Sequence, residues 1–124
     1  MPLSYLNSRS RSFGHALQGL GALLRTQPNA RIHLAACIAV VIASVWCGLS
    51  PVEWAMVTIA IAGVFVAEAM NTAIESVVDL ASPDVHPLAR QAKDVAAGGV
   101  LLAAVASVVI GIIVFGPRLA TLFG

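Results

Sequence analysis

Three long apolar stretches dominate the hydrophobic pattern of the chain, and each is long enough to cross a membrane. Residues 32–49 and 95–115 are nearly continuous apolar runs, and residues 54–67 form a third run with an amphipathic continuation to residue 80. A helix rises about 1.5 Å per residue, so about 20 apolar residues cross the roughly 30 Å hydrocarbon core of a bilayer. The predicted transmembrane helices cover about residues 32–49, 52–80 and 94–115.

An amphipathic segment precedes the first apolar run. Four apolar side chains recur there at helical spacing: Phe13, Leu17, Leu20 and Leu24. Polar side chains fall largely on the other faces, which predicts a helix over about residues 8–27 that lies on the membrane surface. Three glycines in this segment each weaken a helix by about 1 kcal/mol, so a loose N-terminal segment is the alternative.

The connections between the spans carry recognisable helix signals. In Ser50-Pro51-Val52-Glu53, an N-cap serine, a first-turn proline and a capping-box glutamate predict a tight turn into the second span. The second connection runs from Ser82 to Pro87, where two prolines interrupt the helical pattern. Pro87 is well placed in the first turn of the next helix, so residues 81–92 should form a polar loop and a helix start.

The composition agrees with a membrane protein. Of the 124 residues, 59% are hydrophobic and 10% are charged, and the mean hydropathy is +0.91, whereas soluble domains carry about 25% charged residues. The net charge is only +1 and the cationic residues form no dense stripe, so no nucleic-acid partner is expected. We predict an all-α membrane protein with a single domain over residues 1–124.

The cationic side chains are distributed unevenly between the two ends of the spans. Those before the first and third spans are Arg9, Arg11, Arg25, Arg31, Arg90 and Lys93. Only Arg118 follows the third span. Because cytoplasmic segments carry the excess of Lys and Arg, the N-terminus and the second connection are expected in the cytoplasm.

Three helices make a thin bundle, which favours an oligomer.

Polar side chains form a stripe along the second half of the second span. Glu68, Asn71, Glu75 and Asp79 follow at steps of three, four and four residues, which places them on one helical face. An acidic residue at mid-bilayer costs roughly 2.5 to 3.5 kcal/mol, so this stripe must face protein or water. Lys93 and Asp94 begin the third span at the same cytoplasmic level as Glu75 and Asp79.

This set of side chains suits phosphoryl transfer. Carboxylates can hold Mg²⁺ on phosphates, a lysine can offset the charge of a γ-phosphate, and a positioned carboxylate can take the proton of an attacking hydroxyl. Glu68 lies nearest the lipid and is the natural general base. No Walker A motif and no kinase-type glycine-rich loop occurs in the sequence, so an ATP site here would not be of a common soluble type.

Other interpretations of the same residues remain open. Glu68 and Asn71 could merely bond to neighbouring helices, and Asp79 and Lys93 could form an ion pair at the interface. The stripe could also line the cation path of a non-catalytic membrane oligomer. His33, beside Arg31 and without an evident ligand partner, is interpreted as an interfacial side chain with no role.

Two motifs stand out in the second half of the chain: the pattern E-x-x-N-T-A-I-E-x-x-x-D occupies residues 68–79, and A-K-D-x-A-A-G occupies residues 92–98. With these motifs the chain resembles the prokaryotic family of small membrane diacylglycerol kinases and undecaprenol kinases. A weaker match, Asn29-Ala30-Arg31-Ile32-His33-Leu34, is closer to the undecaprenol kinase branch. The resemblance covers nearly the whole chain.

The resemblance implies a homotrimer in the bacterial inner membrane, with active sites shared between subunits at the cytoplasmic side. It implies ATP and Mg²⁺ as donor and metal, and undecaprenol or diacylglycerol as acceptor. Glu68 would be the general base and would meet the lipid, and Glu75 would bind the metal. The other implied roles concern the phosphates (Asn71, Lys93, Asp94), the nucleotide (Asp84, Val85, His86) and the lipid or phosphate (Arg9 or Arg11). Gln27 stands where the family often has a second metal-binding glutamate, and a neutral amide is a weaker ligand for Mg²⁺.

Overall fold

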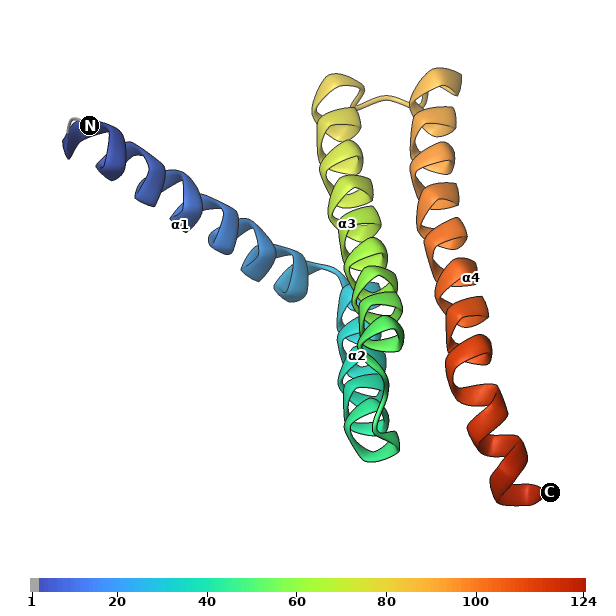
Figure 1. Cartoon of the computed structure of the whole chain (residues 1–124). Coiled ribbons are helices and arrows are strands. Elements are labelled where there is room, and N and C mark those ends of the chain that lie inside the picture. Colours follow the sequence, from blue (N-terminus) through green and yellow to red (C-terminus); the bar gives the residue numbers. More distant parts are fainter. Residues whose placement is uncertain (1–2) are drawn as a thin grey trace.

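The computed structural model describes residues 3–124, which form four helices joined by short connections (Figure 1). In chain order they are α1 (Leu3–Thr26), α2 (Pro28–Cys47), α3 (Pro51–Ala81) and α4 (Pro87–Phe123). The last three are long and apolar enough to cross a membrane, which confirms the predicted all-α fold with three helices able to span it. The segment before the first span is helical from Leu3, not loose, although its position on a membrane surface stays a prediction.

The three long helices form a bundle from which α1 projects sideways (Figure 1). Helix α3 contacts both α2 and α4, and the α3–α4 pair is the most extensive contact. Helix α2 has 20 residues and α3 has 31, so α3 continues past the start of α2 toward the α3–α4 connection. At about 1.5 Å per residue, α2 alone matches the roughly 30 Å hydrocarbon core, and the last turns of α3 extend beyond it.

The turn between α2 and α3 is built as the sequence predicts. Ser50 Oγ accepts a hydrogen bond from the Glu53 backbone N–H at 3.3 Å, and Glu53 Oε1 accepts one from the Ser50 N–H at 3.1 Å. These two reciprocal bonds form a capping box, with Pro51 in the first turn. Before it, Gly48 caps the C-terminus of α2, with a left-handed φ of 66° and an N–H that donates to Ser44 O at 3.1 Å.

A β-branched side chain at Gly48 should destabilise the turn between α2 and α3. A left-handed backbone costs an L-residue roughly 1 to 2 kcal/mol, so Gly48→Val should lower the free energy of unfolding by at least that amount. The measurement is unfolding by SDS titration in mixed micelles. Gly63→Ala is the control, because Gly63 is helical and a Cβ there meets no atom within 4 Å in residues 3–124. Equal stability of Gly48→Val and wild type would contradict this account of the turn.

The connection between α3 and α4 is short and locally bonded. Ser82 Oγ donates to the Asp84 carbonyl at 2.9 Å, and His86 Nδ1 accepts from the Leu88 backbone N–H at 3.1 Å. His86 thereby caps the helix, and Pro87 occupies its first turn as predicted. The loop holds the end of α3 and the start of α4 side by side at one end of the bundle (Figure 1).

Small side chains let α3 and α4 approach closely. Ala103, Ser107 and Gly111 recur every four residues along α4, and Ser107 Oγ lies 3.3 Å from the Ala60 carbonyl of α3. Membrane helices commonly pack through such small residues, because no hydrophobic force drives helices together in lipid and association depends on close van der Waals contact. At the end remote from the α3–α4 loop, Arg118 binds Glu53 through two contacts of 2.5 and 2.9 Å.

Candidate active site

Glu68 is the buried acid of the bundle, and its partner is a histidine. The residue is 2% exposed, and its Oε1 atom lies 3.2 Å from Nε2 of His33 on α2. The expectation that His33 has no evident side-chain partner is therefore wrong, whereas its interfacial position and its lack of a role are not tested by this contact. The depth of the two residues along their antiparallel helices is a signal that can identify this pair. His33 is five residues, or about 8 Å, from the start of α2, and Glu68 lies in the part of α3 that passes this level.

The polar stripe continues from Glu68 toward the α3–α4 loop. Asn71 Nδ2 lies 3.4 Å from Glu75 Oε1, one turn further along α3. Two buried oxygen atoms beside this contact, Asn71 Oδ1 and Thr72 Oγ1, have no hydrogen-bond partner within residues 3–124. Because buried polar atoms in native proteins are nearly always paired, these two oxygens indicate a site that a ligand, an ion or water completes.

A hollow of about 390 Å³ opens at the end of the bundle formed by α3, α4 and their loop. It brings together five of the residues for which the family resemblance implies contact with the nucleotide or its phosphates: Asp84, Val85, His86, Lys93 and Asp94. Lys93 Nζ contacts Asp79 Oδ1, so the ion pair foreseen as an alternative does form. The exposed Asp94 carboxylate lies 3.9 Å from Arg90 Nε on the same helix.

Glu68, Asn71 and Glu75 do not line this hollow. From Asp79 at its rim, Glu68 is eleven residues back along α3, or about 16 Å by helical rise. Asn71 and Glu75 occupy the stripe in between. The structure thus arranges the predicted residues in a series that runs from the exposed loop to the buried carboxylate.

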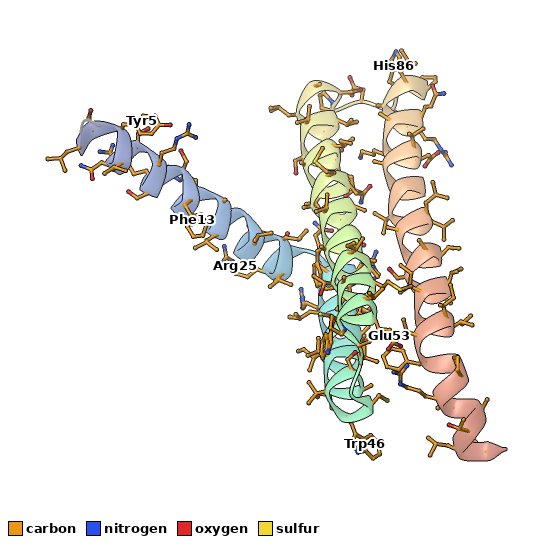
Figure 2. All side chains as sticks on the ribbon, viewed as in Figure 1. Tyr5, Phe13, Arg25, Trp46, Glu53 and His86 are labelled. Atoms are coloured by element: carbon orange, nitrogen blue, oxygen red, sulfur yellow. The ribbon has the colours of Figure 1, made fainter. Side chains whose placement is uncertain are left out.

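The structure does not bring Arg9 and Arg11 to this series within one chain. Both belong to the part of α1 that projects from the bundle, where Tyr5 is labelled in Figure 2. Arg9 lies over the Tyr5 ring at 5.0 Å and donates from Nη2 to its hydroxyl at 2.8 Å. His86 stands at the loop end of the bundle and Trp46 at the other, far from the start of α1 (Figure 2).

Gln27 lies at the joint between α1 and α2, and within residues 3–124 its side chain is not part of a cluster of metal-ligating groups. Its side-chain Nε2 lies 3.4 Å from Thr26 Oγ1. No group of three His, Cys, Asp or Glu side chains converges anywhere in the described residues. Protein carboxylates in the described chain would therefore supply a Mg²⁺ ion with few ligands, which is normal for an ion that arrives on ATP phosphates.

An apolar cavity of about 410 Å³ lies between α2, α3 and α4. His33 is part of its wall, together with side chains such as Cys37, Ala60, Ala104 and Phe115. The cavity therefore reaches from the helix turn that carries the partner of Glu68 toward the opposite end of the bundle. The sequence does not reveal it, because it arises from how three apolar helices are rotated against one another.

Comparison with known proteins decides the family. Residues 14–115 match the protein family described as prokaryotic diacylglycerol kinase. The chain belongs to the prokaryotic diacylglycerol kinase family. Membership in this family of lipid kinases confirms the resemblance and the predicted enzyme class. Arg9 and Arg11 lie outside the matched residues.

Individual members of the prokaryotic diacylglycerol kinase family are similar over most of the chain. The undecaprenol kinase of Bacillus subtilis (strain 168) is 45% identical over 114 residues, which cover 92% of this chain and 93% of that protein. The diacylglycerol kinase of Synechocystis sp. is 41% identical over 90% of this chain and 64% of its own length. The diacylglycerol kinase of Escherichia coli (strain K12) is 26% identical, over 80% of this chain and 81% of its own length.

Proposed function

We propose that this chain transfers the γ-phosphate of ATP to the hydroxyl of a membrane lipid, with Glu68 as the general base. The observation that carries the proposal is the buried Glu68 carboxylate at lipid depth, joined by a polar stripe to a hollow that contains Lys93. Family membership favours this reaction over the cation path of a non-catalytic oligomer.

The reaction balances with one base and one leaving group. The lipid oxygen forms a bond to the γ-phosphorus, while the bond from that phosphorus to the β,γ-bridging oxygen breaks and ADP leaves. Glu68 accepts the hydroxyl proton, which makes the attacking oxygen a better nucleophile. A carboxylate in a water-poor site is well suited to this step, because few other acceptors compete for the proton.

The nucleotide is proposed to bind in the hollow between α3 and α4. Asp84, Val85 and His86 of the loop would contact the nucleotide, and Asp94 with Lys93 would surround its phosphates. Lys93 already has a carboxylate partner in Asp79, so binding would exchange that oxygen for a phosphate oxygen. The triphosphate would then extend along the stripe toward Glu68.

Glu75 and Asn71 fit the role of holding Mg²⁺ on the phosphates. Glu75 offers a carboxylate and Asn71 an unpaired buried oxygen within one helical turn of it, and Mg²⁺ commonly takes one or two protein oxygens beside phosphates and water. When bound, the ion would neutralise charge on the transferring phosphate. Gln27 is a weaker candidate ligand because it is neutral.

Arg9 and Arg11 are proposed to meet the lipid or phosphate of a neighbouring subunit in a homotrimer. Two features support this arrangement: α1 projects out of its own bundle (Figure 1), and most large apolar side chains of the spans are exposed in a single chain. The active site would lie at the cytoplasmic face of a bacterial inner membrane. The excess of cations before α2 and α4 supports this orientation.

Undecaprenol is the acceptor that we propose first. The 45% identical relative is named undecaprenol kinase and aligns along nearly its full length. The test is phosphate transfer from labelled ATP with Mg²⁺ by purified protein in bilayers that contain undecaprenol or diacylglycerol. Label in undecaprenol supports the proposal, label only in diacylglycerol corrects the acceptor, and label in neither from folded protein refutes the kinase reaction.

The apolar cavity supports a lipid acceptor, since part of its chain could lie there with the hydroxyl beside Glu68. Ala104→Phe fills the cavity and should raise the KM for lipid at least about fivefold, because roughly 1 kcal/mol of chain contact is lost for each excluded methylene. The KM for ATP should not change. Ala106→Phe is the matched control, because Ala106 is exposed on the same helix and does not line the cavity. Equal lipid KM values for the two variants would show that the lipid chain does not bind in the cavity.

A further inference from the structure

The contact between Glu68 and His33 joins two helices at the place where the proposed reaction begins. His33 belongs to α2 and Glu68 to α3, and Nε2 and Oε1 approach to 3.2 Å. Glu68 is almost fully buried, whereas 25% of the His33 side chain is exposed. We propose that His33 is a positioning residue that orients the Glu68 carboxylate toward the lipid hydroxyl, an inference that rests on the proposed function of Glu68 as base.

The chemistry of the pair fixes which atom donates. An ionised carboxylate only accepts hydrogen bonds, so a bond between these atoms requires the proton on His33 Nε2. A bond to a charged acceptor in a site of low dielectric is shorter and stronger than one between neutral groups. With Oε1 bound in this way, Oε2 remains free to accept the proton of the substrate.

Glu68 has little else to hold it. In the described part of the chain, His33 is the polar partner that the structure gives to this carboxylate. Asn71, one turn away, directs its amide to Glu75 instead, and Thr72 Oγ1 is unpaired. A glutamate has three rotatable side-chain bonds, so without the imidazole its carboxylate would lose a fixed direction, and small misplacements of a reacting group reduce rate strongly.

The position of His33 also relates it to the proposed substrate. Its imidazole forms part of the wall of the apolar cavity, while Nε2 of the same ring lies 3.2 Å from Glu68 Oε1. The ring therefore borders both the space proposed for the lipid chain and the carboxylate that receives the proton. A group in this place can set the angle at which hydroxyl and base meet without itself touching the phosphate.

The test compares three substitutions of His33 in the full-length protein reconstituted in bilayers. His33→Leu removes the donor and should lower kcat roughly 10- to 100-fold, while the KM values for ATP and lipid change less than about twofold. His33→Gln places an amide N–H near the position of Nε2 and should restore most of kcat. His33→Asn is polar but too short to reach Glu68, so it should behave as His33→Leu. His15→Leu, on the exposed face of α1, is the control for loss of a histidine.

The outcomes separate this inference from the function on which it rests. Wild-type kcat in His33→Leu, or equal losses in His33→Gln and His33→Leu with unchanged oligomeric state, would overturn the positioning role and leave Glu68 as base. Retained turnover in Glu68→Gln would overturn the base itself. Adding His33→Leu to Glu68→Asp should lower kcat little further, because the shortened carboxylate has already left the imidazole, and additive losses would show that His33 acts elsewhere.

Discussion

Glu68→Gln will reduce the turnover of phosphate transfer to lipid by about 10²- to 10⁴-fold, the range that a general base contributes. The amide has the size of the carboxylate and can keep an oxygen facing His33 Nε2, which lies 3.2 Å from Glu68 Oε1, so the packing around this buried position should not change. Only the ability to take the hydroxyl proton is lost. The measurement is kcat with labelled ATP in lipid bilayers at saturating lipid.

ATP binding separates this prediction from a general loss of structure. Glu68 does not line the hollow at the α3–α4 loop, so Glu68→Gln should bind ATP with the affinity of wild type. Unchanged kcat would show that another group takes the proton. Joint loss of ATP binding and kcat would show that the residue supports the fold rather than the chemistry.

Lys93→Met will lower kcat/KM for ATP roughly 10- to 100-fold, because a charged hydrogen-bond donor to the phosphates is lost while the length and apolar part of the side chain are kept. Lys93 lies in the hollow where we place the nucleotide and contacts Asp79 across α3 and α4. The measurement is initial rate against ATP concentration at saturating lipid and Mg²⁺.

Asp79→Asn is the matched control for this prediction. It breaks the same ion pair from the other side but leaves the ammonium of Lys93 available to phosphate. If the lysine serves the nucleotide, Asp79→Asn should have the smaller effect on kcat/KM. If the lysine serves only the ion pair, the two variants should lose activity equally, as the structural interpretation of this pair requires.

The sequence predicts those features of this protein that depend on neighbouring residues. The capping box of Ser50 and Glu53, and Pro87 in the first turn of α4, follow from four or five residues each. The approach of Lys93 to the end of α3, where the hollow lies, can be predicted for the same reason, because a short loop keeps the ends of α3 and α4 together. The family motif names the residues of this end of the bundle, although their roles remain proposals.

Features that depend on how separate helices are rotated were beyond the sequence. Helix α2 is apolar on nearly all faces, so its pattern does not show which side meets α3; matching depths make His33 a possible neighbour of Glu68, but the contact itself depends on the rotation of α2. The apolar cavity depends on three such rotations at once. Arg9 and Arg11 show the opposite case, since their proposed roles need a second chain to bring them to a site.

The close contact of α3 with α4 divides the spans into two classes of position with different freedom to change during evolution. Positions that the single chain exposes, such as Ile59 and Leu102, face lipid or another apolar helix and need only remain apolar, so Leu, Ile, Val and Phe can replace one another there with little effect. Ala60 and Ser107 stand where the two backbones nearly meet, and a larger side chain would push the helices apart. Since Lys93 and Asp79 belong to the same two helices, divergence among homologues should be confined to the outer faces, and the helix pair that carries the proposed nucleotide site should change slowly.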